Sequence, residues 1–223
     1  MPTRLDQAAL PAPLGTRLAL GVDADAVALI EADLLAGPVL IAGRGRSGRT
    51  SALDAVEALL GRGDTAAYVV REGSPQATLE RLTQWLAANP EGSGSWSLVM
   101  VDDAHLWDTE AGVDADSRTA RDDLLRVVAQ NPTRIALLAT ADSTQARQRG
   151  SAGALVDAVR QGRRGFLLQP EWNDGEVLGV TVPTKTAEPL SGAGRGLWCE
   201  GGNAAVAQLV TTDGQTENER GVR

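Results

Sequence analysis

The sequence contains one cysteine, Cys199, and one histidine, His105, among its 223 residues. A lone cysteine cannot form a disulfide within the chain, which fits a reducing, cytosolic compartment. One Cys and one His are also too few for a zinc site built from these ligands. The length is sufficient for an α/β domain with a buried core that needs no crosslinks.

Long apolar runs and positive charge are also scarce. No apolar run reaches the roughly 18 residues that span a bilayer, and no basic, apolar leader is recognised at the start of the sequence. Membrane association is therefore expected only through a larger assembly. The net charge of −8 repels phosphate backbones, which disfavours a nucleic-acid partner.

Short apolar runs alternate with helical patterns through most of the chain. Continuous apolar runs at residues 39–42, 98–101 and 135–140 predict buried parallel strands. Helical patterns follow at residues 50–60, 79–86, 118–128 and 154–160. This alternation predicts an α/β fold with a mostly parallel, doubly wound sheet.

The two ends of the sequence differ in character from the middle. Residues 1–16 are rich in Pro and Ala without periodicity and predict a linker or domain boundary, whereas residues 17–210 form the predicted domain. Within it, residues 18–35 predict an N-terminal hairpin, and residues 194–210 predict a C-terminal β-hairpin that turns at Gly201 and Gly202. The polar residues 211–223 are predicted to be disordered.

The stretch GRGRSGRTS, residues 43–51, fits two phosphate-binding patterns. Gly43, Gly45 and Gly48 match the dinucleotide pattern G-x-G-x-x-G. Gly43, Gly48 and Thr50 match the triphosphate pattern G-x-x-x-x-G-K-T, with Arg49 in place of the lysine. In both loops, glycines let backbone N–H groups approach phosphate at the start of a helix.

Residues further along the chain separate these two interpretations. A dinucleotide site requires an acid after the second strand, where Arg71 and Glu72 are ambiguous, and Tyr68 and Lys185 cannot form the Tyr-x-x-x-Lys pair of a short-chain oxidoreductase. A triphosphate site requires a second apolar strand that ends in acid. The segment LVMVDD, residues 98–103, supplies such a strand, which favours the triphosphate loop.

The predicted site binds ATP or ADP with Mg²⁺. Asp102 is expected to hold Mg²⁺ through water together with Thr50, and Asp103 to polarise the attacking water. Thr140, at the end of its apolar run, is the candidate sensor of the γ-phosphate or of that water, although an ordinary strand-end role remains open. The predicted nucleotide contacts are Gly43, Gly45, Arg46, Ser47, Gly48, Arg49, Thr50 and Ser51.

Arg49 is the residue that departs from the active pattern. Arginine keeps the positive charge, but its guanidinium is larger than an ammonium and planar. It is expected to displace the nucleotide or the transferring phosphoryl group, and a displacement of about 1 Å can lower the rate of hydrolysis on the order of a hundredfold. Lys185 is the only lysine among 21 Lys and Arg residues, so compositional drift also accounts for the change. We predict weakened nucleotide binding and poor or absent hydrolysis.

Four segments together resemble a known family: GPVLIAGRGRSGRTSAL, LVMVDDAHLW, RRGFLLQPEWNDGEVLGVTVP and the closing GRGLWCEGG with VAQLV. Their order is similar to that in FtsK/SpoIIIE-type ATPase domains, most of all the tandem domains of the type VII secretion translocase EccC. The resemblance covers residues 18–210.

This resemblance implies a RecA-like P-loop NTPase domain beside neighbouring ATPase domains of the same or identical chains. It further implies a place at the cytoplasmic face of the inner membrane, as part of a membrane-anchored translocase. Later domains of this family often have degenerate loops, and a pocket on one can bind the C-terminal signal of a WXG-type secreted substrate. The chain is accordingly interpreted as a terminal domain of a longer protein.

Several roles stay open. An arginine that completes a neighbour's site is sought among Arg147, Arg149, Arg160, Arg163 and Arg164, with Arg163 or Arg164 favoured. Trp85 is expected in the core and Trp107 partly exposed. Trp172 and Trp198 are either core residues or part of a substrate groove. His105 could form a hydrogen bond near the site, although a surface or cap position is favoured. Two alternative functions are an active FtsK-like DNA or protein translocase and a vestigial P-loop interaction domain without nucleotide.

Overall fold

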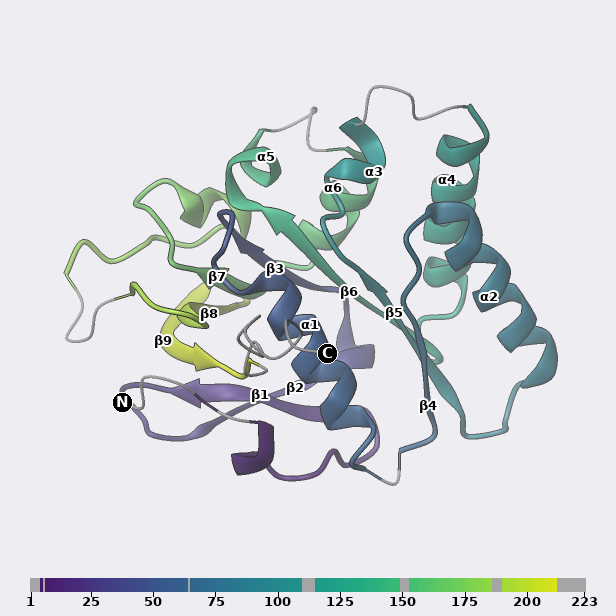
Figure 1. Cartoon of the computed structure of the whole chain (residues 1–223), viewed down its shortest axis with the longest axis horizontal. Coiled ribbons are helices and arrows are strands. Elements are labelled where there is room, and N and C mark those ends of the chain that lie inside the picture. The colour runs from purple at the N-terminus through teal and green to yellow at the C-terminus, as the bar shows by residue number, and fades with distance from the viewer. Residues whose placement is uncertain are drawn as a thin grey trace, which may run out of the picture.

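The computed structural model describes residues 5, 7–63, 65–109, 115–148, 153–185 and 190–211. Within these residues, nine strands form one sheet in the order β2-β1-β9-β8-β7-β3-β6-β5-β4 (Figure 1). The strands are β1 (Arg17–Asp23), β2 (Leu29–Asp33), β3 (Val39–Gly43), β4 (Ala67–Val70), β5 (Trp96–Val101), β6 (Ile135–Asp142), β7 (Arg164–Leu168), β8 (Arg195–Glu200) and β9 (Asn203–Leu209).

Helices connect these strands. The α-helices are α1 (Arg49–Leu60), α2 (Pro75–Ala88), α3 (Leu106–Thr109), α4 (Ala115–Gln130), α5 (Ser143–Arg147) and α6 (Ala154–Arg160). Short 3-10 helices occur at η1 (Gln7–Ala9), η2 (Leu34–Ala36) and η3 (Asp174–Val177). No helix in the described part of the chain has the length and apolar character needed to cross a membrane.

The five strands from β7 to β4 run parallel and are covered on both faces. Val39 and Ile41 of β3 point into a core that also contains the apolar face of α1. Leu40 and Ala42 point into a second core with residues of α2, α4 and α6. The alternation along one strand therefore buries both faces, and the predicted α/β, doubly wound fold is confirmed.

The other strands form an antiparallel region that Figure 1 shows to one side of α1. The predicted C-terminal hairpin is present as β8 and β9, and its turn places Gly201 and Gly202 at φ values of 58° and 86°. β1 and β2 form the predicted N-terminal hairpin, and β1 also pairs with β9. Both predicted hairpins thus join the parallel strands in one sheet, a connection that the sequence pattern did not specify.

Residues before β1 contribute to the core. Leu5 and Leu10 lie in the segment predicted as a linker, yet both are buried against the same cluster as α1. Thr211, the first residue of the predicted tail, is also buried, whereas residues 212–223 lie outside the described residues. The role of residues 1–16 as a connection to another domain stays a prediction.

One glycine allows the central strands to pair closely. Gly165 of β7 has φ of 151°, and a β-carbon there would overlap the backbone of Leu40 in β3. Only glycine leaves room for this approach. Gly165 therefore helps to fix β3, and with it the loop that follows.

Candidate functional site

The predicted site residues meet at the edge where the parallel strands end. β6 lies between β3 and β5, with Ile41 beside Thr140 and Val101 beside Ala139. The loop after β3, the threonine in β6 and the acids after β5 therefore come together, as open α/β sheets commonly arrange their ligand sites.

The loop from residue 43 to residue 48 is shaped by glycines. A β-carbon on Gly43 would overlap the Ser47 hydroxyl and approach Leu168. Gly48 has φ of 99° and precedes α1, and among the described residues its cap position has no side-chain hydrogen bond, so the first-turn N–H groups lack the usual side-chain acceptor. Gly45, Arg46 and Thr50 are exposed, whereas Ser47 is buried. This geometry suits an anion at the start of α1.

Arg49 forms an ion pair with the second acid. Its Nη2 lies 3.0 Å from Oδ1 of Asp103, and the two side chains are 13% and 37% exposed. Asp103 adopts φ of 49°, a left-handed conformation that is uncommon outside glycine. The residue that replaces the loop lysine is therefore held by the acid expected to polarise water.

Thr140 orders both acids. Its hydroxyl accepts a hydrogen bond of 2.8 Å from the Asp103 backbone N–H and donates one of 2.6 Å to Oδ1 of Asp102. Thr140 is fully buried, so in this arrangement it contacts the acids. Its predicted contact with a γ-phosphate or water stays a prediction.

Arg71 is the site residue whose role the sequence analysis missed. Its guanidinium lies 2.6 Å from Asp54, 3.2 Å from Glu57 and 3.8 Å from Oδ2 of Asp102. Burial works to lower the pKa of Arg71, but hydrogen bonds and charge from Asp54 and Glu57, with the charge of Asp102, outweigh burial and raise it. The sequence did show that Arg71 directly follows an expected strand, β4. That β4 lies beside β5, and so brings Arg71 close to Asp102, is seen only in the structure.

His105 is not the surface residue that was expected. It is 9% exposed, and its Nδ1 accepts a hydrogen bond of 3.3 Å from the Asp142 backbone N–H. Burial lowers the pKa of His105, and although Asp103 opposes this shift, the charge of Arg49 adds to it. The imidazole is therefore expected to be neutral and to brace the two strand ends.

The tryptophans divide by exposure. Trp85 is buried as expected, stacked on Tyr68. Trp107, expected to be partly exposed, is 8% exposed, and Trp198 is 9% exposed. Trp172 is 77% exposed, and the preceding Glu171 forms an ion pair with Arg44 of the loop.

Three of the candidate arginines are engaged within the domain, and one of them, Arg147, lies 3.8 Å from the buried carboxylate of Asp174. Arg164 pairs with Glu200 at 2.8 Å and donates to the Asp33 carbonyl at 2.5 Å, and it is only 7% exposed. Arg160 donates to the Ala146 carbonyl at 2.7 Å. Arg149 lies outside the described residues. Arg163 remains the candidate for serving a neighbouring site, since Arg147, Arg160 and Arg164 would have to leave their partners to reach outward.

The expected magnesium ligands, Thr50 and Asp102, lie at the site, but the acids do not fit a divalent cation as they are arranged. Asp103 faces the guanidinium of Arg49, and Asp102 faces that of Arg71. A metal ion would share these carboxylates with two fixed cations, and like charges at this range repel. The exposed backbone and arginines of the loop offer a place for phosphate instead.

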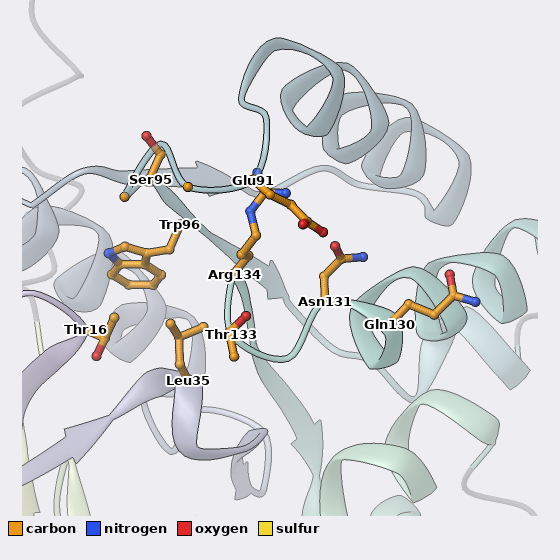
Figure 2. Close-up of a pocket in the computed structure, with 11 residues that line it drawn as sticks. Thr16, Leu35, Glu91, Ser95, Trp96, Gln130, Asn131, Thr133 and Arg134 are labelled. Carbon is orange, nitrogen blue, oxygen red and sulfur yellow. The ribbon is translucent and has the colours of Figure 1, made fainter.

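Two adjoining pockets lie at the opposite edge of the sheet, where β5 and β6 begin. The polar pocket, about 500 Å³, contains Trp96, Asn131 and Arg134, and Figure 2 shows Arg134 between Trp96 on one side and Asn131 on the other. The apolar pocket, about 360 Å³, includes Leu125 and Val128 of α4. Leu35 lines both pockets, and the two pockets together, one apolar half and one polar half, are called the groove.

Comparison with known proteins rests on structure. Searches against protein-family models and curated protein sequences found no match. The cytoplasmic domain of the type VII secretion ATPase EccC of Thermomonospora curvata superimposes with a TM-score of 0.73 at 17% sequence identity, over 96% of this chain and 28% of that chain. ATPases 2 and 3 of the same EccC, in complex with a signal sequence peptide, give a TM-score of 0.69 at 15% identity, over 96% and 44%.

Two further solved structures share the fold. EssC (ATPases 2 and 3) of Geobacillus thermodenitrificans gives a TM-score of 0.72 at 14% identity, over 96% of this chain and 45% of that one. The pCW3 conjugation coupling protein TcpA, solved with ATPγS, gives 0.63 at 15% identity, over 96% and 71%. The chain thus has the RecA-like P-loop fold of EccC and EssC ATPase domains and spans less than half the length of those EccC and EssC chains.

Proposed function

We propose that this chain is a nucleotide-binding ATPase module of a type VII protein-secretion translocase, with poor or absent hydrolysis. The observation that carries the proposal is the ion pair between Arg49 and Asp103. The loop keeps the glycines and the uncapped helix start that bind phosphate. Asp103, the acid that would polarise water, is paired with Arg49, the residue that would hold phosphate. The chain would therefore bind a nucleotide without hydrolysing it efficiently.

The residues suggest how a nucleotide would be held. Phosphate oxygens accept hydrogen bonds from the backbone N–H groups of residues 43–51, and Arg49 turns from Asp103 toward them. Guanidinium binds phosphate in a bidentate manner, but its planar fork does not follow a transferring phosphoryl group as a lysine ammonium does. Thr140 keeps Asp102 and Asp103 in place during this exchange.

ATP titration tests this proposal, with thermal stability and phosphate release as the two measurements. We expect ATP to raise the melting temperature modestly, Arg49→Lys to bind ATP more tightly, and phosphate release from the unmodified chain to be negligible. Absence of ATP binding by both proteins would leave the vestigial interaction domain as the better account. Brisk hydrolysis by the unmodified chain would instead support the active translocase.

The groove at the opposite edge supports a second role, recognition of a secretion signal. Its apolar half, formed by Leu35, Leu125 and Val128, suits the apolar side chains of a helical peptide. EccC of similar fold has been solved with a signal sequence peptide. We propose that this groove receives the C-terminal signal of a WXG-type substrate.

Peptide titration measures this second role directly. Val128→Asp places a charge in the apolar half and should weaken binding of a helical C-terminal signal peptide by at least about tenfold, since burying an unpaired carboxylate is costly. Arg126→Asp, on the exposed side of the same helix, serves as the matched control. Equal affinity of both variants would exclude the groove as the signal site, provided that both still bind ATP.

The proposed setting is a translocase at the cytoplasmic face of the inner membrane, where neighbouring ATPase domains contact this one. The described residues contain no membrane-spanning helix, so attachment would come through the larger assembly. DNA binding with a steep salt dependence would favour a DNA translocase instead, against the expectation from the net charge of −8.

A further inference from the structure

The carboxylates at the loop are already neutralised by the protein itself. Oδ1 of Asp103 lies 3.0 Å from Arg49, and Oδ2 of Asp102 lies 3.8 Å from Arg71. The other oxygen of Asp102 accepts the hydroxyl hydrogen of Thr140. In a metal-dependent site, a divalent cation separates such acids from the phosphates. Here two guanidiniums take that position.

Arg71 is fixed in its role by three acids. It bridges Asp54 and Glu57 of α1 to Asp102 after β5, and its side chain is only 24% exposed. Because α1 begins at the phosphate loop, this bridge connects the loop helix to the acid strand without a metal ion. A fixed cation at this place disfavours a second cation beside it.

The loop also carries more positive charge than a single lysine supplies. Arg44 and Arg46 lie in the exposed part of the loop, and Arg49 begins α1. Arg44 forms an ion pair with Glu171, and the backbone of Arg46 is left-handed, with φ of 65°. Together these three guanidiniums can neutralise much of the charge of a triphosphate.

We propose that this site binds the free polyphosphate of its nucleotide without a divalent cation: Arg71 neutralises Asp102, and Arg49, which pairs with Asp103 until phosphate arrives, then supplies the positive charge that a metal would bring. The inference rests on the proposed nucleotide binding and identifies its ligand as the metal-free nucleotide. It also accounts for poor hydrolysis, because no metal ion is present to stabilise the developing charge on the phosphates.

The decisive measurement is the affinity for ATP by isothermal titration, once in EDTA and once in excess Mg²⁺. Mg²⁺-bound ATP carries less negative charge than free ATP, so a site lined by guanidiniums should prefer the free form. We expect binding in EDTA to be at least as tight as in Mg²⁺, with excess Mg²⁺ weakening it by about threefold or more. A requirement for Mg²⁺ would overturn the inference and leave the proposed nucleotide binding standing.

Two variants extend the test. Arg49→Lys combined with Arg71→Gln frees Asp102 and restores the loop lysine, so ATP should now bind about tenfold more tightly with Mg²⁺ than in EDTA. Arg81→Gln is the matched control, because Arg81 pairs with Glu72 and not with the loop acids. Mn²⁺ in the presence of ATP gives a separate readout by electron paramagnetic resonance, with retention expected in the double variant only.

Each outcome of these titrations either supports or contradicts metal-free nucleotide binding. Mn²⁺ retained with ATP by the unmodified chain would contradict the inference, as would a double variant that folds but stays indifferent to Mg²⁺. If the double variant does not fold, the comparison of EDTA with Mg²⁺ on the unmodified chain still decides. Absence of ATP binding in both conditions would refute the proposed function and the inference with it.

Discussion

Replacing Asp103 by asparagine should make the chain less stable and better at binding nucleotide. The change keeps the shape of the side chain, and it keeps the hydrogen bond that the backbone N–H of residue 103 donates to the Thr140 hydroxyl. It removes the negative charge that faces Arg49. The Arg49 side chain is 13% exposed, so its guanidinium would then be largely buried without its carboxylate. Nucleotide-free stability should fall, whereas Arg49 should become available to phosphate.

The size of the effect follows from distance and exposure. Opposite charges 4 Å apart attract by about 4 kcal/mol at an effective dielectric constant near 20. The Asp103 side chain is 37% exposed, so solvent screens much of this, and we expect a loss of about 1–2 kcal/mol. For a domain of this size, that loss lowers the melting temperature by roughly 3–6 °C. If phosphate must break the same ion pair, ATP affinity rises by about 5- to 30-fold.

Chemical denaturation without nucleotide and ATP titration measure the two effects separately. An Arg49→Gln background provides the control, because Asp103→Asn should change affinity much less there, and the residual change reports direct repulsion between Asp103 and phosphate. A variant that loses stability and ATP affinity together would refute the reasoning, since the ion pair would then support the bound state rather than compete with it.

Three further changes test other parts of the structure. Thr140→Val removes the buried hydroxyl between the two acids and should cost about 1–3 kcal/mol in unfolding free energy, measured in urea, whereas Thr119→Val, on the exposed face of α4, should change it little. Because burial lowers the folded-state pKa of His105 below its ordinary value of 6.5, the unfolded chain binds a proton more readily, so stability should fall as the pH drops through 6.5. His105→Asn should flatten this part of the stability curve, and an unchanged slope would show that His105 does not contribute. Gly165→Ala should cost more than about 3 kcal/mol, because its β-carbon would overlap the Leu40 backbone. A native melting temperature for that variant would mean that the β3 and β7 pairing is looser than described.

The sequence predicted the parallel strands because each has a local signal. The apolar runs at residues 98–101 and 135–140 are continuous, and a strand buried on both faces requires this composition. The acids after one strand and the threonine in another could therefore be assigned to the same edge of the sheet. In the structure, Thr140 forms a hydrogen bond with each of Asp102 and Asp103.

The contacts that define the site's chemistry could not be predicted in the same way. Arg71 reaches Asp102 only because β4 pairs with β5, and no local pattern specifies that order. Asp103, the partner of Arg49, has a left-handed backbone conformation that no local pattern predicted. The burial of Leu5 and Leu10 was missed because isolated apolar residues between prolines have no periodicity. Such features depend on tertiary context.

The position of β3 in the sheet has a consequence for synthesis of the chain. β3 pairs only with β6 and β7, which both leave the ribosome after the acid strand β5. β1 can pair early with β2 but awaits its second partner β9, the last strand of the described chain. All five β3 residues are buried in the finished domain, so an apolar strand stays unpaired while much of the domain is being made. Such late, long-range pairing slows folding and exposes nascent chains to aggregation. Within this domain, the phosphate loop is therefore translated early but takes its final shape late.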